Sequence, residues 1–549
     1  MKSRPSSLRT HRGQPATLPS SPAAILGLGT ALTLGAALTP PTARAADWPE
    51  WCGSATKNMI SAEVGLPAAF SPGKRLKGKE DVDMATTQNC LWVAKLGSQS
   101  YGTPTISDGK ILLGTNNEVP RDAGKTGDRA NFMCFDEKTG KYLWQLVIPK
   151  LGAGKVSDWE YLGQCSSPFI EAGIAYTVTN RCEVIAFDMN GQTNGNDGDF
   201  QDEAKYFTPT AAPGQPAPPV AKVLPTDGDV LWRFDMREEL GVFPHNITSS
   251  SVLVQGDTVF ATTSNGVDWT HTNIPNPSAP AFIAVNKKTG AYLGEEGSKI
   301  SERCLHCNWS SPAYSPIAGK PMVVFGGGDG FLYGFDPVPK AESDDVSILP
   351  ELFRFDAIPP ELRFKEDGTT KRKYADPDGP SEIIATPVVY KDRVYVAIGQ
   401  DPEHGEGKGC LSCIDVTKMG DISKSGVVWQ YKDIERSIST VAIADGLLYA
   451  ADYSGRLHCL DAETGKKHWV FDTKGHIWSS PLVADGKVYL GNEEGELNIL
   501  AHGKEMKKLA TVEFPAPIMS SPVAVNGRLL VTTMTHLYCF DEGATPVAQ

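Results

Sequence analysis

The sequence predicts an all-β chain, an eight-bladed β-propeller of four-stranded antiparallel blades that is closed by an N-terminal strand. Three observations lead to this fold class. A unit of short alternating apolar runs separated by glycine turns recurs about every 40 residues. The small-residue start of that unit occurs eight times. A tryptophan-bearing run, which normally ends the unit, also precedes the first start.

The unit is clearest in residues 439–469. A first apolar run ends at Asp445-Gly446, a second covers residues 447–451, and a third covers residues 457–460. Period-2 runs between glycine turns are typical of antiparallel strands. A Glu-Thr-Gly-Lys turn then leads to Trp469 in a fourth run, which completes a four-stranded blade.

Each copy of the unit begins with a short stretch of small residues. The eight starts are Gly102-Thr103-Pro104, Ser166-Ser167-Pro168, Ser249-Ser250-Ser251, Ser310-Ser311-Pro312, Ala385-Thr386-Pro387, Ser439-Thr440-Val441, Ser479-Ser480-Pro481 and Ser520-Ser521-Pro522. In seven of the eight, a Gly or Asp follows five residues after the third position, namely Gly109, Gly173, Gly256, Asp392, Gly446, Gly486 and Gly527. Eight starts predict eight blades.

The fourth run carries an aromatic residue in most copies: Trp92, Trp144, Trp232, Trp429 and Trp469, with Phe353 as a variant. Trp92 comes before any first strand, and the last copy runs out of chain before its own fourth strand. Residues 89–97 are therefore predicted to supply that missing strand beside Phe540. A ring closed in this way leaves no unpaired sheet edge.

Length and charge limit the classes of function. A chain of 549 residues would usually contain several domains, but the repeat spans nearly all of it and predicts one propeller over residues 89–543. The net charge of -13 disfavours nucleic acid as a ligand and gives no indication of binding to an anionic membrane. We expect a monomer with a short tail over residues 544–549.

The N-terminus has the pattern of a signal peptide over residues 1–45. Basic residues are followed by an apolar stretch at residues 23–38 and by Ala43-Arg44-Ala45, a small-x-small cleavage site. An uncleaved anchor is the alternative, although the apolar stretch is short for a membrane span. The pattern predicts a periplasmic or extracellular protein with no transmembrane segment after signal removal. Residues 46–88 are expected to form an extended lead-in that packs on the propeller.

The eleven cysteines divide into two groups. Cys134, Cys413, Cys459 and Cys539 occupy a slot two residues before the aspartate that ends the third strand, where other copies have Ala or Gly, so we expect small, buried, unpaired side chains there. The remaining seven are Cys52, Cys90, Cys165, Cys182, Cys304, Cys307 and Cys410. Two CxxC spacings leave a zinc site, one or more disulfides, or free thiols as alternatives. Haem attachment is excluded because Asn308, rather than His, follows Cys307.

Insertions are concentrated in blades 1 to 5, which predicts that the loops of these blades build a binding face. They are residues 119–130, 190–228, 268–279, 338–348, 357–380 and 400–407. Asn194, Asn196, Asp197, Asp199 and Asp202 crowd together within the second insertion, but their order does not match a calcium loop, so a solvated turn-rich loop is preferred.

Residues 462–469 and 137–144 resemble the tryptophan-docking repeat of pyrroloquinoline-quinone (PQQ) propellers. The lead-in at residues 47–51 and 65–67 is similar to that of exported PQQ-like propellers. The superfamily includes quinoprotein dehydrogenases and the non-enzymatic outer-membrane assembly lipoprotein BamB. The resemblance covers residues 89–543 and implies the fold more strongly than the cofactor, because the docking tryptophan is a packing device.

The resemblance implies two functions. Quinoprotein alcohol dehydrogenases carry two adjacent cysteines over the cofactor, a catalytic Asp, and Glu and Asn ligands for calcium; this sequence has no Cys-Cys pair, and the other residues cannot be placed by motif. The lipoprotein cysteine of BamB is also missing after Ala45. We therefore predict a non-catalytic binding or scaffold protein, with a protein, peptide or saccharide bound at the axial funnel and the loops of blades 1 to 5. The alternative is a PQQ-dependent oxidoreductase, with calcium, acting on an alcohol or sugar.

Residues just before the small starts are predicted to converge on the axis, where they would contact a ligand. The candidates are Trp159, Gln164, His245, Asn246, His306, Trp309, Glu382, Arg436, His476 and Trp478. The alternative is that Trp309 and Trp478 pack between blades and the others solvate the rim. No catalytic residue and no metal site are assigned. Glu403, His404 and Glu406 offer metal ligands, but a solvated hairpin is preferred there.

Overall fold

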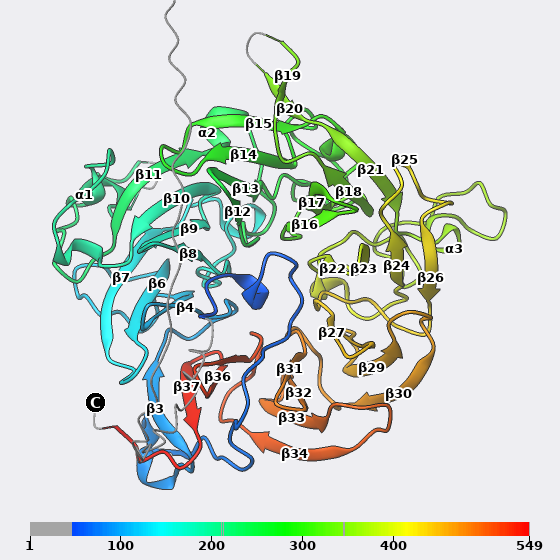
Figure 1. The fold of residues 1–549 in the computed structure, drawn as a ribbon. Coiled ribbons are helices and arrows are strands. Elements are labelled where there is room, and N and C mark those ends of the chain that lie inside the picture. Colours follow the sequence, from blue (N-terminus) through cyan, green and yellow to red (C-terminus); the bar gives the residue numbers. More distant parts are fainter. Residues whose placement is uncertain (1–46, 210, 212–213, 344–345, 548–549) are drawn as a thin grey trace, which may run out of the picture. The chain divides into compact units, whose positions relative to one another are not determined.

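Each predicted unit forms one four-stranded antiparallel sheet in the computed structural model, which describes residues 47–209, 211, 214–343 and 346–547. The predicted signal peptide lies outside the described residues. The turns follow from the sequence: Asp445 and Gly446 have φ of 49° and 77°, as in the tight hairpin turns that suit twisted strands. The described residues form the predicted eight-bladed propeller, and Figure 1 shows its sheets following one another around a ring.

The strands of each blade follow one another from the axis outwards. Blades 1 to 4 consist of β4 (Thr105–Ser107), β5 (Lys110–Asn116), β6 (Arg129–Asp136) and β7 (Tyr142–Pro149); β8 (Phe169–Glu171), β9 (Ile174–Val178), β10 (Glu183–Asp188) and β11 (Asp229–Asp235); β12 (Leu253–Gln255), β13 (Thr258–Thr262), β14 (Phe282–Asn286) and β15 (Tyr292–Glu296); and β16 (Ala313–Ile317), β17 (Lys320–Gly326), β18 (Phe331–Phe335) and β21 (Glu351–Asp356).

The second half of the ring repeats this order. Blades 5 to 8 consist of β22 (Val388–Tyr390), β23 (Arg393–Ala397), β24 (Leu411–Asp415) and β26 (Val427–Tyr431); β27 (Ala442–Ala444), β28 (Leu447–Ala451), β29 (Arg456–Asp461) and β30 (Lys467–Asp472); β31 (Leu482–Ala484), β32 (Lys487–Gly491), β33 (Glu496–Ala501) and β34 (Lys508–Glu513); and β35 (Val523–Val525), β36 (Arg528–Thr532), β37 (His536–Asp541) and β3 (Cys90–Lys95).

The ring closes as the sequence predicts. Strand β3 pairs antiparallel with β37, so that Trp92 lies opposite Cys539 and Cys90 lies opposite Phe540. Figure 1 shows these two strands, from opposite ends of the described chain, side by side. The eighth blade is thus completed by the segment that precedes the first one.

Cross-strand pairing explains the slot for small side chains. In six blades a small residue on the third strand faces an aromatic residue on the fourth: Cys134 faces Trp144, Ala186 faces Trp232, Gly334 faces Phe353, Cys413 faces Trp429, Cys459 faces Trp469 and Cys539 faces Trp92. In blade 7 the sizes are exchanged, because Ile499 faces Ala510. The two positions therefore share one volume, which either strand can fill.

The same tryptophans join neighbouring blades. Trp92 Nε1 donates to the carbonyl oxygen of Glu137 in blade 1 at 3.0 Å, and Trp469 Nε1 donates to that of Gly503 in blade 7 at 3.0 Å. A Cβ at Gly140, where φ is 66°, would lie 2.5 Å from the Trp92 ring. The Thr-Gly turn of each docking repeat therefore leaves room for the indole of the preceding blade.

A belt of hydrogen bonds surrounds the axis at the start of the first strands. The backbone N–H of one blade donates to a hydroxyl of the next, as from Ser167 to Ser251 at 3.0 Å and from Ser521 to Thr103 at 3.1 Å. In blade 3 the residue of the belt is Ser251, the third residue of the predicted start, rather than Ser250. The predicted alignment of this blade was therefore wrong by one residue.

The lead-in crosses the first strands of most blades. Its backbone bonds are Ile106 N to Trp48 O at 2.8 Å, Ile170 N to Pro49 O at 2.8 Å, Tyr314 N to Ala55 O at 2.7 Å, Val389 N to Thr56 O at 3.0 Å and Val483 N to Met59 O at 3.0 Å. Figure 1 shows this segment in dark blue across the middle of the ring. Trp51 Nε1 donates to Thr386 Oγ1 of the hydroxyl belt at 2.9 Å. The lead-in therefore joins blades that are distant in sequence.

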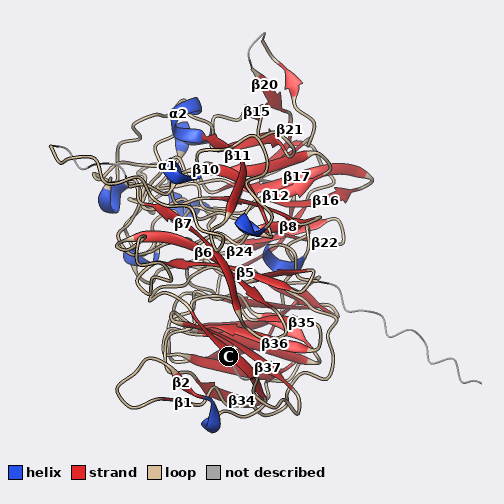
Figure 2. Ribbon diagram, turned by 90° about the vertical axis from the view of Figure 1, so that its left-hand side faces the viewer, coloured by secondary structure: helices blue, strands red, loops and turns tan. Residues whose placement is uncertain are grey.

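Short elements decorate the ring. They are the strands β1 (Lys74–Arg75), β2 (Val82–Asp83), β19 (Lys340–Ala341), β20 (Ser347–Leu349) and β25 (Gly420–Asp421); the helices α1 (Glu203–Tyr206), α2 (Met236–Leu240) and α3 (Pro360–Arg363); and the 3-10 turns η1 (Trp51–Gly53), η2 (Met84–Thr86), η3 (Gly154–Val156), η4 (Gly191–Thr193), η5 (Ile300–Arg303) and η6 (Pro402–His404). Figure 2 shows β20 standing beyond the blade that it extends, and β19 pairs with it.

All eleven cysteines lie within the described residues, where they are free thiols, and ten of them are buried. Cys307 Sγ donates to Ser264 O at 3.2 Å. Among the described residues, the clusters close enough to share a metal ion contain no cysteine. No helix in the described ranges is both long and apolar enough to cross a bilayer.

Candidate functional site

A cavity of about 660 Å³ lies on the axis, where the segments before the first strands converge. This size suits a small ligand. Its wall contains the residue directly before each start, once blade 3 is aligned correctly: Tyr101, Cys165, Ser249, Trp309, Ile384, Ile438, Trp478 and Met519. A narrower space of about 140 Å³ continues from it to the hydroxyl belt and Trp51. The lead-in therefore contributes to the floor of the axial channel.

Five aromatic rings stand around the cavity: Tyr101, Trp159, Trp309, Tyr453 and Trp478. The rings of Tyr101 and Trp478 lie 5.7 Å apart between centroids, and those of Tyr453 and Trp478 lie 6.3 Å apart. Trp309 Nε1 donates to Ile247 O at 2.9 Å, and Trp478 Nε1 donates to Glu493. Hydrogen bonds to both indoles fix their faces in the wall.

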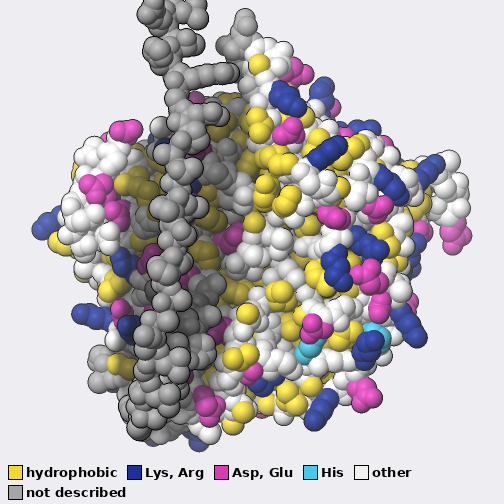
Figure 3. Space-filling view, in the orientation of Figure 1, with side chains coloured by type: hydrophobic (Ala, Val, Ile, Leu, Met, Phe, Trp, Pro, Cys, Tyr) yellow, Lys and Arg dark blue, Asp and Glu magenta, His cyan; other side chains and the backbone are white. Residues whose placement is uncertain are grey.

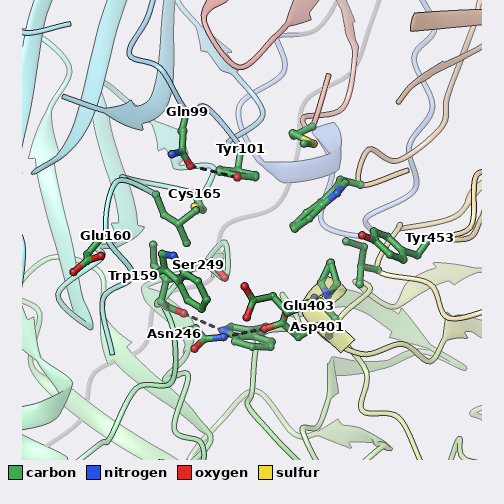
Figure 4. Close-up of a pocket in the computed structure, with 18 residues that line it drawn as sticks. Gln99, Tyr101, Trp159, Glu160, Cys165, Asn246, Ser249, Asp401, Glu403 and Tyr453 are labelled. Atoms are coloured by element: carbon green, nitrogen blue, oxygen red, sulfur yellow. Dashed lines mark hydrogen bonds between the residues drawn. The ribbon is translucent and has the colours of Figure 1, made fainter. Parts of the chain in front are cut away.

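Three of the polar side chains that line the cavity are carboxylates. Glu160, Asp401 and Glu403 line it, and Figure 4 shows Asp401 and Glu403 beside Asn246. Asp401 accepts from Asn246 Nδ2 at 2.9 Å and from the backbone N–H of Glu403 at 3.0 Å. Burial raises the pKa of Asp401. None of the described residues that line the cavity is Lys or Arg.

Four of the ten candidates line this cavity: Trp159, Asn246, Trp309 and Trp478. Asn246 links two loops, since its carbonyl oxygen accepts from the Trp159 backbone N–H at 2.7 Å while its side chain binds Asp401. Lys155 Nζ covers the Trp159 ring at 4.5 Å from the centroid. These contacts connect the loop after blade 1, the segment before blade 3 and the η6 loop of blade 5.

Three other candidates support the wall from outside the cavity. Gln164 is buried and donates to Val178 O at 2.8 Å. Arg436 is buried and donates to His404 O at 3.1 Å and to Asp376 O at 2.6 Å, which holds the loop around η6. His476 stacks on Tyr453 with centroids 4.4 Å apart and an angle of 3° between the ring planes.

The remaining three candidates gather behind Trp309 with a residue that was not predicted, His271. The rings of His245 and His306 lie 4.3 Å apart between centroids, and each lies 5.1 Å from His271. Glu382 Oε1 accepts from Tyr374 Oη at 2.8 Å and lies 3.9 Å from His306 Nδ1. His404 packs against this group, with its ring 5.2 Å from that of His306.

Two sets of residues were considered as metal ligands from the sequence, the acidic residues of the second insertion and the Glu403, His404 and Glu406 hairpin. Both make contacts with protein groups. Asp197 lies close to Asp188 and Asp229, and Asn194 Nδ2 donates to both Asp188 at 3.0 Å and Asp197 at 2.9 Å, so hydrogen bonds within the loop engage these carboxylates. Glu406 faces His476 at 3.3 Å. Of these two sets, Glu403 of the hairpin lines the axial cavity, whereas the acidic loop does not.

Several residues that line the cavity were not predicted, and the sequence contains a signal for one of them. Tyr101 directly precedes a start, as Trp309 and Trp478 do, and the same rule would have selected it. Tyr453 and Asp401 lie after second strands, so a rule based on first strands could not reach them.

The described lining offers no Lys or Arg to PQQ, a flat tricarboxylate, and holds three carboxylates. Asn246, Asp401 and Glu403 are residues of the kinds that would hold the calcium that accompanies PQQ. The Asp401 oxygens already accept hydrogen bonds from Asn246 and Glu403. Among the described residues that line the cavity, the cysteine is Cys165. Its neighbours in the sequence are Gln164 and Ser166, so the cavity has no pair of adjacent cysteines in its described lining.

Comparisons with known proteins agree on the repeat. A family model described as "Outer membrane protein assembly factor BamB" matches residues 415–504, which include blade 6. The crystal structure of BamB from Moraxella catarrhalis aligns with a TM-score of 0.51 at 13% identity, covering 82% of this chain and 99% of that chain. At this identity the likeness concerns the fold alone.

Two curated relatives match at low identity. Lupanine 17-hydroxylase [cytochrome c] from Pseudomonas sp is 22% identical over 493 residues, which are 81% of this chain and 64% of the relative. Outer membrane protein assembly factor BamB from Nitrosomonas eutropha is 26% identical over 121 residues, which are 22% of this chain and 29% of the relative. The chain therefore spans less than two thirds of the length of these relatives.

Proposed function

Because the chain is a PQQ-like β-propeller, and this fold does not by itself decide between binding and catalysis, we propose that it is a non-catalytic binding protein whose axial cavity takes a saccharide. The observation that carries the proposal is the lining: five aromatic rings and three carboxylates, with no cationic side chain among the described lining residues. The ligand is neutral or carries an amine.

The chemistry of a sugar matches this lining. The faces of Trp309 and Trp478 offer flat apolar surface for the C–H face of a pyranose ring, since aromatic side chains supply most of the contact area in such pockets. Carboxylates accept but do not donate, so Glu160 and Glu403 suit hydroxyl or ammonium donors. A uronic acid or phosphorylated sugar would meet like charges in a partly enclosed space.

Binding isotherms test the proposal. A neutral β-glucan oligosaccharide, a partly deacetylated chitooligosaccharide and an oligogalacturonate are each titrated by calorimetry into the purified protein. The first or the second binds, and the acidic oligomer does not. Trp478→Ala weakens binding at least tenfold, whereas Trp269→Ala, in an exposed loop outside the cavity, leaves it unchanged. Preferred binding of the acidic oligomer would overturn the proposal.

A PQQ-dependent oxidoreductase is the second candidate, favoured by the match to lupanine 17-hydroxylase over most of this chain. Its test is reconstitution with PQQ and calcium, followed by dye reduction with alcohols and sugars. We expect no reduction above the rate without protein. Substrate-dependent reduction would contradict the non-catalytic function, and PQQ retained by protein purified from its native host would point the same way.

We also propose that the protein is exported from the cytoplasm. The basic and apolar pattern of residues 1–45 supports a cleaved signal and a periplasmic or extracellular location, and the matched BamB is named for assembly at the outer membrane. N-terminal sequencing of the mature protein tests this: we expect it to begin at Ala46. A chain that retains Met1 in the native host would contradict cleavage.

A further inference from the structure

Three histidines from three separate loops meet beside the axial cavity. His245 lies between α2 and β12, His271 lies in the loop between β13 and β14, and His306 lies just before β16. Each histidine has a ring nitrogen that lies within 4.8 Å of a ring nitrogen of each of the other two. We propose that this cluster, the three-histidine site, binds a first-row transition-metal cation of the Zn²⁺ class.

The geometry is close to that of a tetrahedral site. His306 Nε2 lies 3.1 Å from His271 Nδ1. Nitrogen ligands at about 2.0–2.1 Å from Zn²⁺ lie about 3.4 Å from one another in a tetrahedron. One ring nitrogen of each histidine lies within 4.8 Å of those of the other two, which is at most about 1.4 Å more than the separation in a tetrahedron.

The hydrogen bonds of the site leave one ring nitrogen of His245 free, and the hydrogen bond between His306 Nε2 and His271 Nδ1 is the contact that a bound cation would replace. His245 Nδ1 lies 2.6 Å from Val267 O, so this nitrogen carries the proton and Nε2 has a free lone pair. His245 Nε2 is buried and has no hydrogen-bond partner. A bond from the outer ring nitrogen to a backbone carbonyl is the usual arrangement of a histidine that binds metal.

The outer nitrogen of His306 makes no hydrogen bond but lies near a buried glutamate. His306 Nε2 faces the cluster, while Nδ1 points toward Glu382 Oε1 at 3.9 Å. Glu382 is buried and is held by the Tyr374 hydroxyl. A carboxylate behind a metal-bound imidazole orients the ring and increases its basicity.

Ligand chemistry selects the class of metal. Imidazole nitrogens suit Zn²⁺ and its first-row neighbours, whereas Ca²⁺ and Mg²⁺ prefer oxygen ligands. Cys304 and Cys307 flank His306 in sequence, but Cys307 Sγ donates to Ser264 O at 3.2 Å, and neither thiol belongs to the cluster. Three histidines leave a fourth position for water or a ligand group.

A metal here would hold the cavity wall. His245 is followed by Asn246, which lines the cavity and binds Asp401 of the η6 loop. His271 belongs to an insertion, residues 268–279, whose hydrogen bonds include Asn273 to Asp268 within the loop and Asn276 Nδ2 to Gly241 O at 2.8 Å outside it. Coordination therefore fastens three loops of blades 3 and 4 beside the wall, independently of which ligand the cavity takes.

Metal binding to the whole purified protein tests the site. After chelator treatment, Zn²⁺ is titrated by calorimetry and Co²⁺ is followed by its visible absorption. We expect one Zn²⁺ per chain, tetrahedral-type Co²⁺ bands and no comparable binding of Ca²⁺. His271→Gln, in a partly exposed loop, lowers Zn²⁺ affinity at least tenfold and abolishes the bands. His468→Gln, on β30 far along the chain and of similar exposure, changes neither.

A second variant guards against a folding artefact. His306→Gln removes a buried ligand. The thermal unfolding of metal-free His271→Gln and of metal-free His306→Gln is compared with that of the metal-free parent chain, which separates loss of folding from loss of the metal. Zn²⁺ raises the unfolding midpoint of the parent chain and of His468→Gln, but not of His271→Gln. Absence of stoichiometric Zn²⁺ binding by the parent chain, or parental affinity in His271→Gln, would overturn the site.

Discussion

Replacing Trp92 by Ala tests ring closure through one side chain. Trp92 is fully buried on β3, and its indole donates to Glu137 O at 3.0 Å across the boundary between blades 8 and 1. Truncating a buried Trp costs about 3–5 kcal/mol. The value lies in the upper half of this range, because Glu137 O also loses its hydrogen-bond donor.

The comparison with Trp469 makes the prediction sharper. Trp469 occupies the same register in blade 6, is 8% exposed and donates to Gly503 O at 3.0 Å. If residues 89–97 are a true fourth strand, Trp92→Ala and Trp469→Ala lower the free energy of unfolding by similar amounts. Trp269→Ala, at a side chain that is 63% exposed, changes it by less than about 0.5 kcal/mol.

Urea unfolding followed by far-ultraviolet circular dichroism measures all three variants, because this signal does not depend on the tryptophan removed. A loss below about 1 kcal/mol for Trp92→Ala, beside a large loss for Trp469→Ala, would refute the reasoning. The N-terminal strand would then add little to the eighth blade, and closure of the ring would not contribute to stability.

Two further substitutions test packing and burial. Cys459→Ile overfills the slot opposite Trp469 and lowers the free energy of unfolding by about 1–3 kcal/mol in the same urea assay. Glu296 has its pKa raised to about 7 by burial, from 4.5, so the folded state holds the proton more tightly. Stability therefore falls as pH rises from about 4.5 to about 7, by about 3.4 kcal/mol at most. Glu296→Gln removes this decline in a series of unfolding midpoints across that range.

Matched variants complete these tests. Cys459→Ala fits the slot and costs about 1 kcal/mol or less, while the double variant Cys459→Ile/Trp469→Ala imitates Ile499 and Ala510 of blade 7 and is less destabilised than the sum of its parts. Strict additivity would show that the two positions share no volume. Glu505→Gln, at an exposed site, keeps the decline with pH, and an unchanged decline in Glu296→Gln would assign it to other groups.

Sequence periodicity was sufficient for the blades because the same physical constraint recurs in each. A small residue must face a large one across the outer strand pair, and a left-handed turn must follow the first strand, so Cys459, Trp469 and Gly446 mark their positions from the chain alone. The register failed at Ser249-Ser250-Ser251, where three identical residues give no basis for choosing which one enters the hydroxyl belt.

The position before each start identified part of the cavity wall. Trp309 and Trp478 directly precede starts and line the cavity, as expected of that position. His271 lies in an insertion with no periodicity, and its neighbours His245 and His306 come from other loops, so only the folded chain brings the three together. The contact of Trp51 with Thr386 spans 335 residues and has no local signal.

The most direct measurement for the proposed function is a crystal structure of the protein soaked with its tightest-binding neutral or amino-sugar oligosaccharide. We predict a pyranose ring stacked on Trp309 or Trp478, with a hydroxyl or amine donating to Glu403. A sugar bound on the outer strands with the axial cavity left to solvent, or a flat quinone in that cavity, would contradict the account.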